Sequence, residues 1–353
     1  MTAVATSLPT PTALAAEAER KRALALDAAA GVLVTSRPAD VRWLLCGRGR
    51  PVDDSAPRSP YTVALDGERA RVLYPDIEDS RVREEEGLDE LGYELVPYPW
   101  HQGHGLEESP SLPDGLRIEL GDDELARYRV AGAAVANAVR ETLFELGPQW
   151  TELRAAAELA ARAHERGFTT PVVLVGGEDR QRIHRHPLPT EAPLGRHALL
   201  AITAEREGLH VSMTRLVSFG RPPHGLEALV HAAAEIDAAY LSGSRPGVTL
   251  GDIFAAGSQA YAAQGFPEEW RRHHQGGLTG YRGREVFAVP NESTAVPAKA
   301  AVAWNPSLTG GAKSEDTVLV TAEGIDVITR TPDLGEIETT GGPRPAIVVL
   351  DGA

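Results

Sequence analysis

The sequence predicts an α/β protein that is divided into two domains. Its 353 residues exceed the ~250–300 residues that a single hydrophobic core usually serves. Short β-rich runs alternate with helical runs in the first hundred residues, and the second half contains two pairs of helical segments with strands between them. We therefore expect an N-terminal domain over residues 1–121, with 1–12 as a disordered Pro/Thr/Ala-rich tail, and a second domain over 122–353.

The N-terminal domain is predicted to be one sheet flanked by helices. Residues 14–29 are helical by composition, and a second helix is expected over 76–86. The strands are expected at 31–35, 41–46, 61–65, 70–74 and 93–98. A segment crowded with His, Gly and Pro follows over 99–114 and is predicted to be a linker.

The C-terminal domain is predicted to contain two helix pairs, each with antiparallel strands, in the manner of a duplicated unit. Asp122 and Asp123 favour a helix start, because acidic side chains suit the N-terminal end of the helix dipole. The helices are expected at 122–146, 151–165, 226–241 and 250–264. The strands are expected at 172–175, 199–204, 209–216, 286–289, 300–305 and 317–321.

Composition and charge exclude several classes of function. A net charge of −15 argues against binding to a phosphate backbone, which needs clustered cations. No apolar run reaches the ~18–20 residues of a membrane span, and the first residues lack the basic-then-apolar order of a signal peptide. A single cysteine, Cys46, permits no internal disulfide and suits a reducing compartment. We expect a cytoplasmic protein without nucleic-acid or membrane partners.

Histidines and carboxylates gather in three segments that could carry chemistry. His186 lies in an extended run with two prolines that would hold it rigidly, and an imidazole with a pKa of ~6.5 suits proton transfer near neutrality. His273 and His274 precede two glycines, which imply a close approach of the backbone. Glu315 lies where a charged segment enters an apolar strand. Each segment alone fits a solvated loop or strand end equally well.

A fourth segment, residues 43–50, places Cys46 beside Arg48 and Arg50. No histidine within the segment activates the thiol, so a buried structural cysteine is favoured over a nucleophile. The two arginines are candidates for binding a carboxylate, which a guanidinium recognises through two parallel hydrogen bonds.

The order of these segments resembles the pita-bread family, which includes methionine aminopeptidase, Xaa-Pro peptidases (prolidase and aminopeptidase P) and creatinase. The segments that carry the resemblance are 186–190, 209–219 with Met213-Thr214-Arg215, the loop at His274, Glu285, Asn305-Pro306, and Glu315-Asp316-Thr317 followed by Glu323-Gly324. The resemblance covers nearly the whole chain. It implies a small ribonuclease-H-like α/β domain followed by a pita-bread domain, assembled as a homodimer.

The resemblance also locates the positions where the peptidases of this family hold two metal ions through two Asp, one His and two Glu. Those positions are occupied here by Ala201, Ser212, His274, Asn305 and Glu315. The aspartate pair belongs on a hairpin predicted to turn at 205–208, with Ala201 facing Ser212. Three of the five ligands are replaced by groups that do not bind divalent ions as anions. We expect no metal at these positions and no other cofactor.

The creatinase branch of the family, which lacks these metals, supplies the other functional positions. Its catalytic His matches His186, and its Tyr-x-Gly-Arg-Glu segment looks like residues 281–285. Its Trp-Leu-x-Cys segment looks like residues 43–50, which implies that Arg50 reaches a site shared with the partner subunit. The resemblance thus gives His186, Glu285 and Glu315 as catalytic candidates, and Arg50, Tyr281, His274, His273, Arg284 and Arg48 as substrate-binding candidates.

Together these residues predict a metal-independent, creatinase-like enzyme that acts on a C–N bond of a small amidine, guanidino or amino-acid-derived substrate. Two carboxylates in one site repel each other and need a positive partner, which a cationic substrate would supply. The same residues fit a lyase or cyclase that works by proton abstraction at His186. Two further alternatives are a metal-dependent Xaa-Pro aminopeptidase or dipeptidase and a non-catalytic pita-bread binding module.

Overall fold

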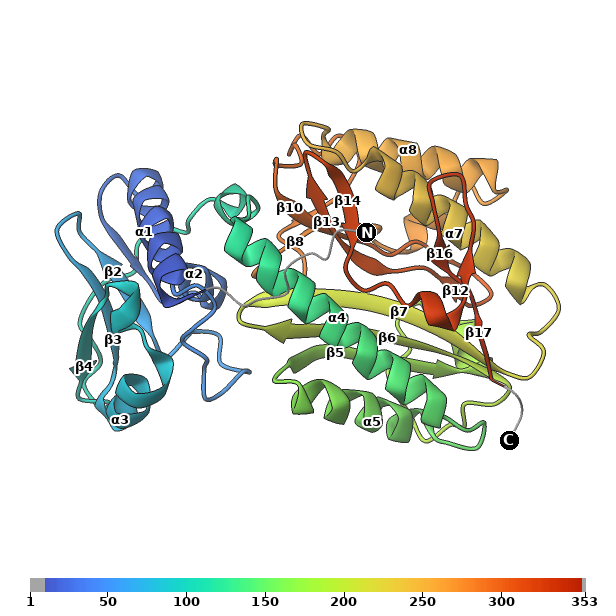
Figure 1. Cartoon of the computed structure of the whole chain (residues 1–353), viewed down its shortest axis with the longest axis horizontal. Helices are drawn as coiled ribbons and strands as arrows, with labels where there is room; N and C mark the ends of the chain where they lie inside the picture. The colour runs from blue at the N-terminus through green and yellow to red at the C-terminus, as the bar shows by residue number, and fades with distance from the viewer. Residues whose placement is uncertain (1–9, 351–353) are drawn as a thin grey trace. The chain divides into compact units, whose positions relative to one another are not determined.

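The computed structural model describes residues 10–350, which form two compact units (Figure 1). The first unit contains the chain up to Arg127 together with 206–209 and 280–282, and the second contains the rest. Residues 1–9 of the predicted disordered tail lie outside the described residues. The predicted disorder is wrong for residues 11 and 12, which begin helix α1 (Pro11–Ala28), and Thr10 caps this helix through its side-chain oxygen.

The first unit is built on a four-stranded sheet in the order β1-β2-β3-β4, in which only the β3–β4 pair is parallel. The strands are β1 (Leu33–Thr35), β2 (Thr62–Leu65), β3 (Ala70–Pro75) and β4 (Glu94–Tyr98). The helical elements besides α1 are α2 (Pro38–Leu44), η1 (Asp76–Glu78), α3 (Asp79–Arg81), η2 (Val82–Glu86), η3 (Asp89–Leu91) and η4 (Asp114–Arg117). The expected helix over 76–86 is therefore a series of three short helical segments.

The strand expected at 41–46 is wrong, because residues 41–44 belong to helix α2 and the next two residues follow its C-terminal end. Pro38 lies at the first helical turn, where its fixed φ suits a helix. Val41, Leu44 and Leu45 are all buried and follow the i, i+3, i+4 spacing of one helix face. A run of apolar residues this short fits a strand or a helix equally well, and only the position of the proline favoured the helix. Cys46 is buried as expected, and burial raises the pKa of its thiol to about 12.

A buried charged cluster joins α1 to two other segments of the first unit. Lys21 Nζ lies 2.5 Å from Glu17 and 2.8 Å from Glu124, and it also donates to the Tyr281 hydroxyl at 2.8 Å. Arg127 adds a second cation, which lies 2.7 Å from Glu17. Both carboxylates are thereby compensated in the interior, where an unpaired charge would cost several kcal/mol.

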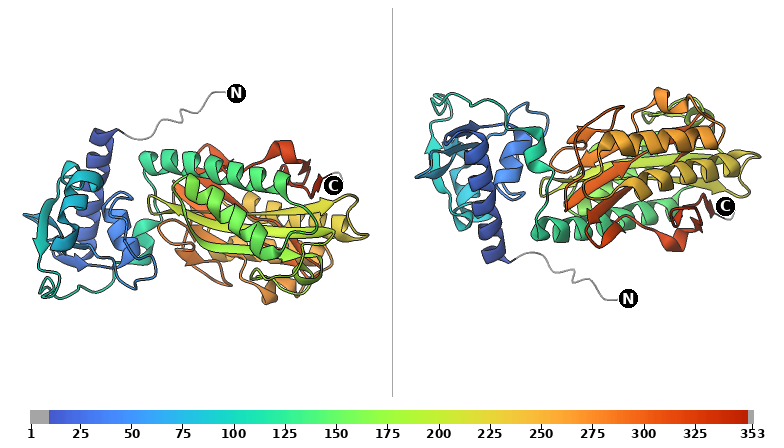
Figure 2. Two further views of the ribbon diagram at one scale, coloured as in Figure 1. Left: turned by 90° about the horizontal axis from the view of Figure 1, so that it is seen from below. Right: turned by 90° about the horizontal axis from the view of Figure 1, so that it is seen from above.

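The second unit consists of two sheets with helix pairs on their outer faces (Figure 2), and both sheets are antiparallel except for the parallel β17–β7 pair of the first. One sheet has the order β17-β7-β6-β5 and the other β14-β13-β10-β8-β9. Helices α4 (Asp122–Glu145) and α5 (Glu152–Glu165) cover the first sheet, and α7 (Leu226–Gly243) and α8 (Leu250–Ala263) cover the second. The short helical elements are α6 (Glu178–Gln181), η5 (Glu269–Arg272) and η6 (Pro332–Leu334).

The strands of the first sheet are β5 (Thr169–Gly177), β6 (His197–Arg206), β7 (Leu209–Phe219) and β17 (Val348–Leu350). Those of the second are β8 (Gly276–Thr279), β9 (Val286–Phe287), β10 (Ala300–Trp304), β13 (Asp316–Thr321) and β14 (Gly324–Val327). Four short strands complete the unit: β11 (Ser307–Leu308), β12 (Ala312–Lys313), β15 (Glu336–Ile337) and β16 (Arg344–Pro345). The predicted helices and most predicted strands are present, with ends that differ by a few residues.

The close backbone approach expected after the paired histidines is confirmed. Gly276 and Gly277 have φ values of 106° and 145°, and a Cβ on either would fall against backbone atoms of the neighbouring strands. Strand β8 can therefore lie between β10 and β9 only because its first two residues are glycines. Within residues 10–350 the structure contains no helix with the length and hydrophobicity of a membrane span.

The charged cluster of the first unit yields a stability prediction. Replacing Lys21 with Met leaves two buried carboxylates with less positive charge, so we expect the free energy of unfolding to fall by ~3–5 kcal/mol. The matched control is Arg20→Met, because Arg20 also pairs with Glu124, but with a side chain that is 42% exposed. We expect the control to change stability by less than ~1 kcal/mol. Urea denaturation measures both, and equal losses in the two variants would contradict the role of Lys21.

Candidate functional site

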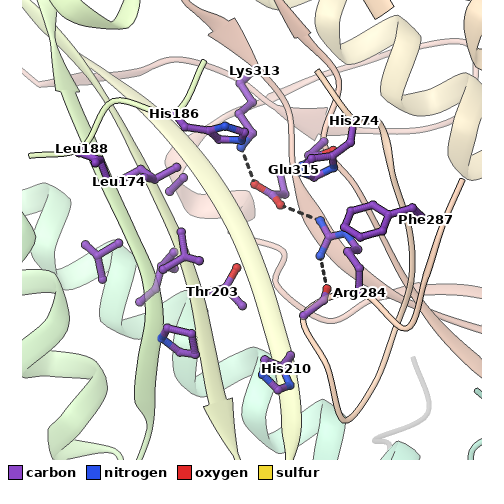
Figure 3. Close-up of a pocket in the computed structure, with 17 residues that line it drawn as sticks. Leu174, His186, Leu188, Thr203, His210, His274, Arg284, Phe287, Lys313 and Glu315 are labelled. Atoms are coloured by element: carbon purple, nitrogen blue, oxygen red, sulfur yellow. Dashed lines mark hydrogen bonds and ion pairs between the residues drawn. The ribbon is translucent and has the colours of Figure 1, made fainter. Parts of the chain in front are cut away.

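A cavity of about 580 Å³ opens in the second unit, between its two sheets (Figure 3). Strands β5 and β6 supply a largely apolar wall, and the ends of β10 and β13 with their neighbouring loops supply most of the polar groups. The lining residues are Pro171, Val172, Val173, Leu174, His186, Leu188, Ala201, Ile202, Thr203, His210, His274, Gly283, Arg284, Phe287, Asn305, Lys313 and Glu315.

Glu315 is held between two cations at the polar end of the cavity (Figure 3). Its carboxylate lies 3.0 Å from Lys313 Nζ and 3.2 Å from Arg284 Nη2, and it accepts a hydrogen bond of 2.7 Å from the Thr214 hydroxyl. Burial alone would raise the pKa of Glu315, but Lys313 and Arg284 outweigh it and hold that pKa below its ordinary range. The carboxylate is therefore ionised and already compensated by the protein.

This arrangement corrects the expected electrostatics of the site. The sequence suggested that Glu285 and Glu315 form an uncompensated carboxylate pair that a cationic substrate would neutralise. The structure supplies two protein cations to Glu315, and Glu285 is not among the residues that line the cavity. A cationic substrate is thus not required for charge balance.

Strand register places Glu315 beside the other polar residues of the second sheet. Trp304 pairs with Asp316 at the end of the antiparallel β10–β13 ladder. The residues just beyond this pair, Asn305 after β10 and Glu315 before β13, therefore lie opposite each other. The backbone N–H of Asn305 donates to the backbone carbonyl of Gln275 at 3.1 Å, which links this row of polar residues to the histidine loop. Glu315 also forms an isolated bridge with Thr214 of β7, where the two sheets meet.

His186 is fixed on a loop that is tied down on both sides. Arg185 donates to Ser307 at 3.0 Å and to Thr309 at 2.8 Å, and it pairs with Glu269. On the other side, Pro187 packs against Gly176 of β5, where any side chain would clash with the proline ring. The backbone of His186 is therefore set by contacts with two different parts of the unit, which agrees with the rigidity expected from the sequence.

His273 and His274 approach His186 from the loop before β8. The buried side chain of Gln275 holds this loop, since it donates to the His273 carbonyl at 2.6 Å and accepts from the Tyr261 hydroxyl at 2.8 Å. The Nε2 atoms of His273 and His186 lie 2.9 Å apart, and the His273 and His274 rings stack with centroids 4.6 Å apart. The structure thus brings together three histidines that are separated by up to 88 positions in the sequence.

The surroundings favour the neutral form of all three imidazoles. Burial, and after it the charge of Lys313, lowers the pKa values of His186 and His273. Burial and the Arg284 charge lower the pKa of His274 to about 4. Neutral rings can accept a proton or donate a nitrogen lone pair, which are the two reactive properties of this cluster.

The β6–β7 hairpin differs in register from the expectation. Strand β6 ends at Arg206 and β7 begins at Leu209, so Glu207 and Gly208 form a two-residue turn with φ values of 53° and 79°. Positive φ at both positions is characteristic of a type I′ hairpin. Thr203 therefore lies opposite Ser212, and their hydroxyls are 2.9 Å apart. The expected pairing of Ala201 with Ser212 is wrong, and Ala201 faces Thr214 instead.

The other predicted substrate-binding residues have different surroundings. Tyr281 is 3% exposed, and its hydroxyl belongs to the buried charged cluster of the first unit. Arg48 in that unit binds the Gly87 carbonyl and Glu90. Arg50 is exposed, and no hydrogen bond or ion pair involves it within residues 10–350. Substrate contacts of Glu285, Tyr281, Arg48 and Arg50 stay predictions.

Lys313 is the main site residue that is absent from the candidates predicted by the sequence. A signal was available, because residues two apart in an extended chain point to the same side, which places Lys313 beside Glu315. Lys313 is also one of only three lysines in the chain, with Lys21 and Lys299. The apolar wall gave no comparable signal, since nothing in β5 marks which of its valines face a cavity.

The two facing sheets with external helix pairs, and a polar site between them, define a pita-bread protein. A model of metallopeptidase family M24 matches residues 126–322, which is more than half of the chain. The chain belongs to metallopeptidase family M24. The predicted resemblance and fold class are thereby confirmed.

Solved structures with the same fold cover nearly the whole chain. The dipeptidase PepE from Mycobacterium ulcerans is 20% identical, with a TM-score of 0.73 over 95% of this chain and 99% of that one. An Xaa-Pro dipeptidase from Bacillus anthracis is 16% identical, with a TM-score of 0.74 over 94% and 100%. The N-terminal domain of the FACT complex subunit SPT16 from chickpea is 9% identical, with a TM-score of 0.62 over 91% and 97%. No curated protein matches the chain by sequence.

The residues at the five expected metal positions do not fit a pair of divalent ions. Ala201 offers a methyl group, and the Ser212 hydroxyl is engaged with Thr203. Asn305 offers a neutral amide. Glu315 supplies the only carboxylate among the five, and Lys313 and Arg284 already occupy both of its oxygens. Two cations therefore lie where a metal centre would need anions.

This arrangement yields a metal-binding prediction. We expect the protein, purified without chelator and dialysed against Mn²⁺, to retain no manganese, because this ion prefers carboxylate ligands. Elemental analysis after gel filtration measures the metal-to-protein ratio. Two equivalents of manganese, with activity that chelation removes and Mn²⁺ restores, would contradict the account and favour a metal-dependent peptidase.

Proposed function

We propose that this protein is a metal-independent enzyme that hydrolyses a C–N bond of a small, amino-acid-derived substrate in the cavity of its second unit. The observation that carries the proposal is the engagement of Glu315 by Lys313 and Arg284 beside a neutral, rigidly held His186. This arrangement lacks the ligands of the family's metal centre but retains a positioned base and a charged binding surface. The function is thereby closer to that of the creatinase branch than to that of the peptidases.

Unsatisfied polar atoms on the cavity wall support a polar ligand. Arg284 Nε and Asn305 Oδ1 are buried, and neither has a hydrogen-bond partner within residues 10–350. Both residues line the cavity. A buried polar atom without a partner costs ~1–3 kcal/mol, so a substrate that satisfied these atoms would recover that energy on binding.

The charges that line the cavity favour a substrate with a negatively charged group at one end. With neutral histidines, Lys313 and Arg284 contribute two positive charges against the single negative charge of Glu315. This balance favours a substrate with a carboxylate, and the guanidinium of Arg284 suits carboxylate recognition. Val172, Leu174 and Leu188 provide an apolar surface for the rest of the molecule. An amino-acid derivative combines both features.

His186 is proposed to move the proton. It would accept a proton from a water molecule as the water oxygen attacks the carbon of the C–N bond. The same proton would then pass to the nitrogen as that bond breaks, so that the leaving amine departs neutral. General acid–base catalysis of this kind contributes roughly 10²–10⁴-fold to the rate. His274 is proposed to hydrogen-bond the substrate.

A homodimer with a shared site is part of the proposal. Arg50 is exposed and is proposed to bind the far end of the substrate in the partner subunit. A cytoplasmic location is proposed because the chain has a single cysteine, which is buried and permits no internal disulfide.

The second candidate is a non-catalytic binding module. The three contacts of Glu315 favour it, because they leave only about one of the roughly four lone-pair sites of the carboxylate for a substrate or a proton. The two candidates differ in the role of His186, which the module would not require for turnover.

The role of His186 can be tested with a substrate panel. Guanidino acids, cyclic amidines such as ectoine, and Xaa-Pro dipeptides are screened with wild-type protein, and the best substrate is taken forward. We expect His186→Ala to lower kcat by at least ~10²-fold while the dissociation constant changes little. His184→Ala is the matched control, since His184 lies two residues away and does not line the cavity. A fully active His186→Ala variant, or turnover of dipeptides alone, would contradict the proposal.

The shared site can be tested by subunit complementation. Arg50→Ala and His186→Ala homodimers are each expected to be nearly inactive. In a heterodimer of the two variants, one site combines an intact His186 with the intact Arg50 of the other subunit, and the second site lacks both. Random mixing makes half of the dimers heterodimers, so about a quarter of wild-type activity should return. Sedimentation checks that a dimer exists. A monomer at micromolar concentration, or no recovery on mixing, would remove Arg50 from the site.

A further inference from the structure

The cluster of three histidines is a second potential binding site at the edge of the cavity. We propose that His186, His273 and His274 bind one divalent transition-metal ion of the zinc type. One ring nitrogen from each of the three can be chosen so that all lie within 4.8 Å of one another. Zn–N bonds of ~2.0–2.1 Å in a tetrahedral site place ligand atoms roughly 3.3 Å apart, so modest side-chain rotation closes the site.

The surroundings leave the three rings available as ligands. None of them forms an ion pair within residues 10–350, and His273 Nδ1 is buried without a hydrogen-bond partner. The only hydrogen bond between rings joins His273 and His186, and a metal ion would replace its shared proton. The backbone of each ligand is held by Arg185, Pro187 or Gln275, so little main-chain order has to be gained on binding.

The donor set selects the type of ion. Three imidazole nitrogens suit Zn²⁺ and its neighbours Co²⁺ and Ni²⁺, whereas Mn²⁺ and Mg²⁺ prefer oxygen. This site shares only His274 with the five expected metal positions and requires none of the missing carboxylates. Because His186 and His274 both line the cavity, a fourth coordination position would face it. Lys313 opposes the ion electrostatically, but its charge is paired with Glu315 at 3.0 Å.

Binding would have a consequence for activity, and this part rests on the proposed function. An ion bound to His186 occupies the nitrogen lone pair that accepts the proton from water. The ion is therefore an inhibitor, and the enzyme with an empty histidine cluster is the active form.

Cobalt titration of the full-length protein tests the site directly. We expect one equivalent of Co²⁺ to bind, with the intense visible absorption of tetrahedral cobalt, and Zn²⁺ to displace it. His273→Gln removes a direct ligand and should raise the dissociation constant for Co²⁺ by more than ~100-fold. Loss of a residue that only orients a metal ligand typically costs ~10–100-fold. His210→Gln is the matched control, because His210 lines the same cavity but lies apart from the cluster (Figure 3). Lys313→Met should tighten binding, because a repelling charge is removed.

The outcomes separate the two claims. Absence of cobalt binding at millimolar metal, or equal binding by wild-type protein and His273→Gln, would overturn the metal site whatever the enzyme does. Cobalt binding with unchanged or increased turnover would overturn the inhibitory role and would also count against His186 as the base. If the protein turned over no substrate at all, the cobalt titration would still decide whether the histidine site binds metal.

Discussion

The site depends on the ion pairs that Glu315 forms with Lys313 and Arg284. A buried carboxylate is stable only when its charge is compensated, and here two side chains of the same unit compensate it. Strand pairing fixes this geometry, because β13 places Glu315 opposite Asn305 and against Thr214. Two protein cations thus pair with the one carboxylate that the resemblance assigns to a metal centre.

The histidines depend on a different constraint, the close fit of two loops. Gly176 leaves room for Pro187, and the glycines that open β8 allow it to lie between its neighbours. The buried Gln275 then sets the position of the histidine pair. Three neutral rings are therefore held near one carboxylate that is already compensated. Acid–base chemistry and nitrogen coordination are both compatible with this arrangement, and they compete for His186.

The sequence predicted much of the fold and part of the site. Long periodic helices such as α4 and α7 were predicted because their patterns extend over many residues, and the family was predicted from the order of short motifs. Helix α2 was missed because a short apolar run is compatible with the periodicity of a helix and with that of a strand. The hairpin register was missed because Glu207 adopts a positive φ that is uncommon for a residue other than Gly. The Arg284–Glu315 pair was missed because these residues are 31 positions apart and meet only in the folded unit, whereas the spacing of Lys313 and Glu315 was a local signal.

The central claim is that protein cations, and not metal ions, compensate Glu315. Crystals of the wild-type protein soaked in Mn²⁺, with anomalous data collected near the manganese edge, test it most directly. The account predicts no anomalous peak near Glu315 and Asn305, with Lys313 and Arg284 still paired to the carboxylate. Two peaks a few ångströms apart, with Lys313 displaced from Glu315, would contradict it.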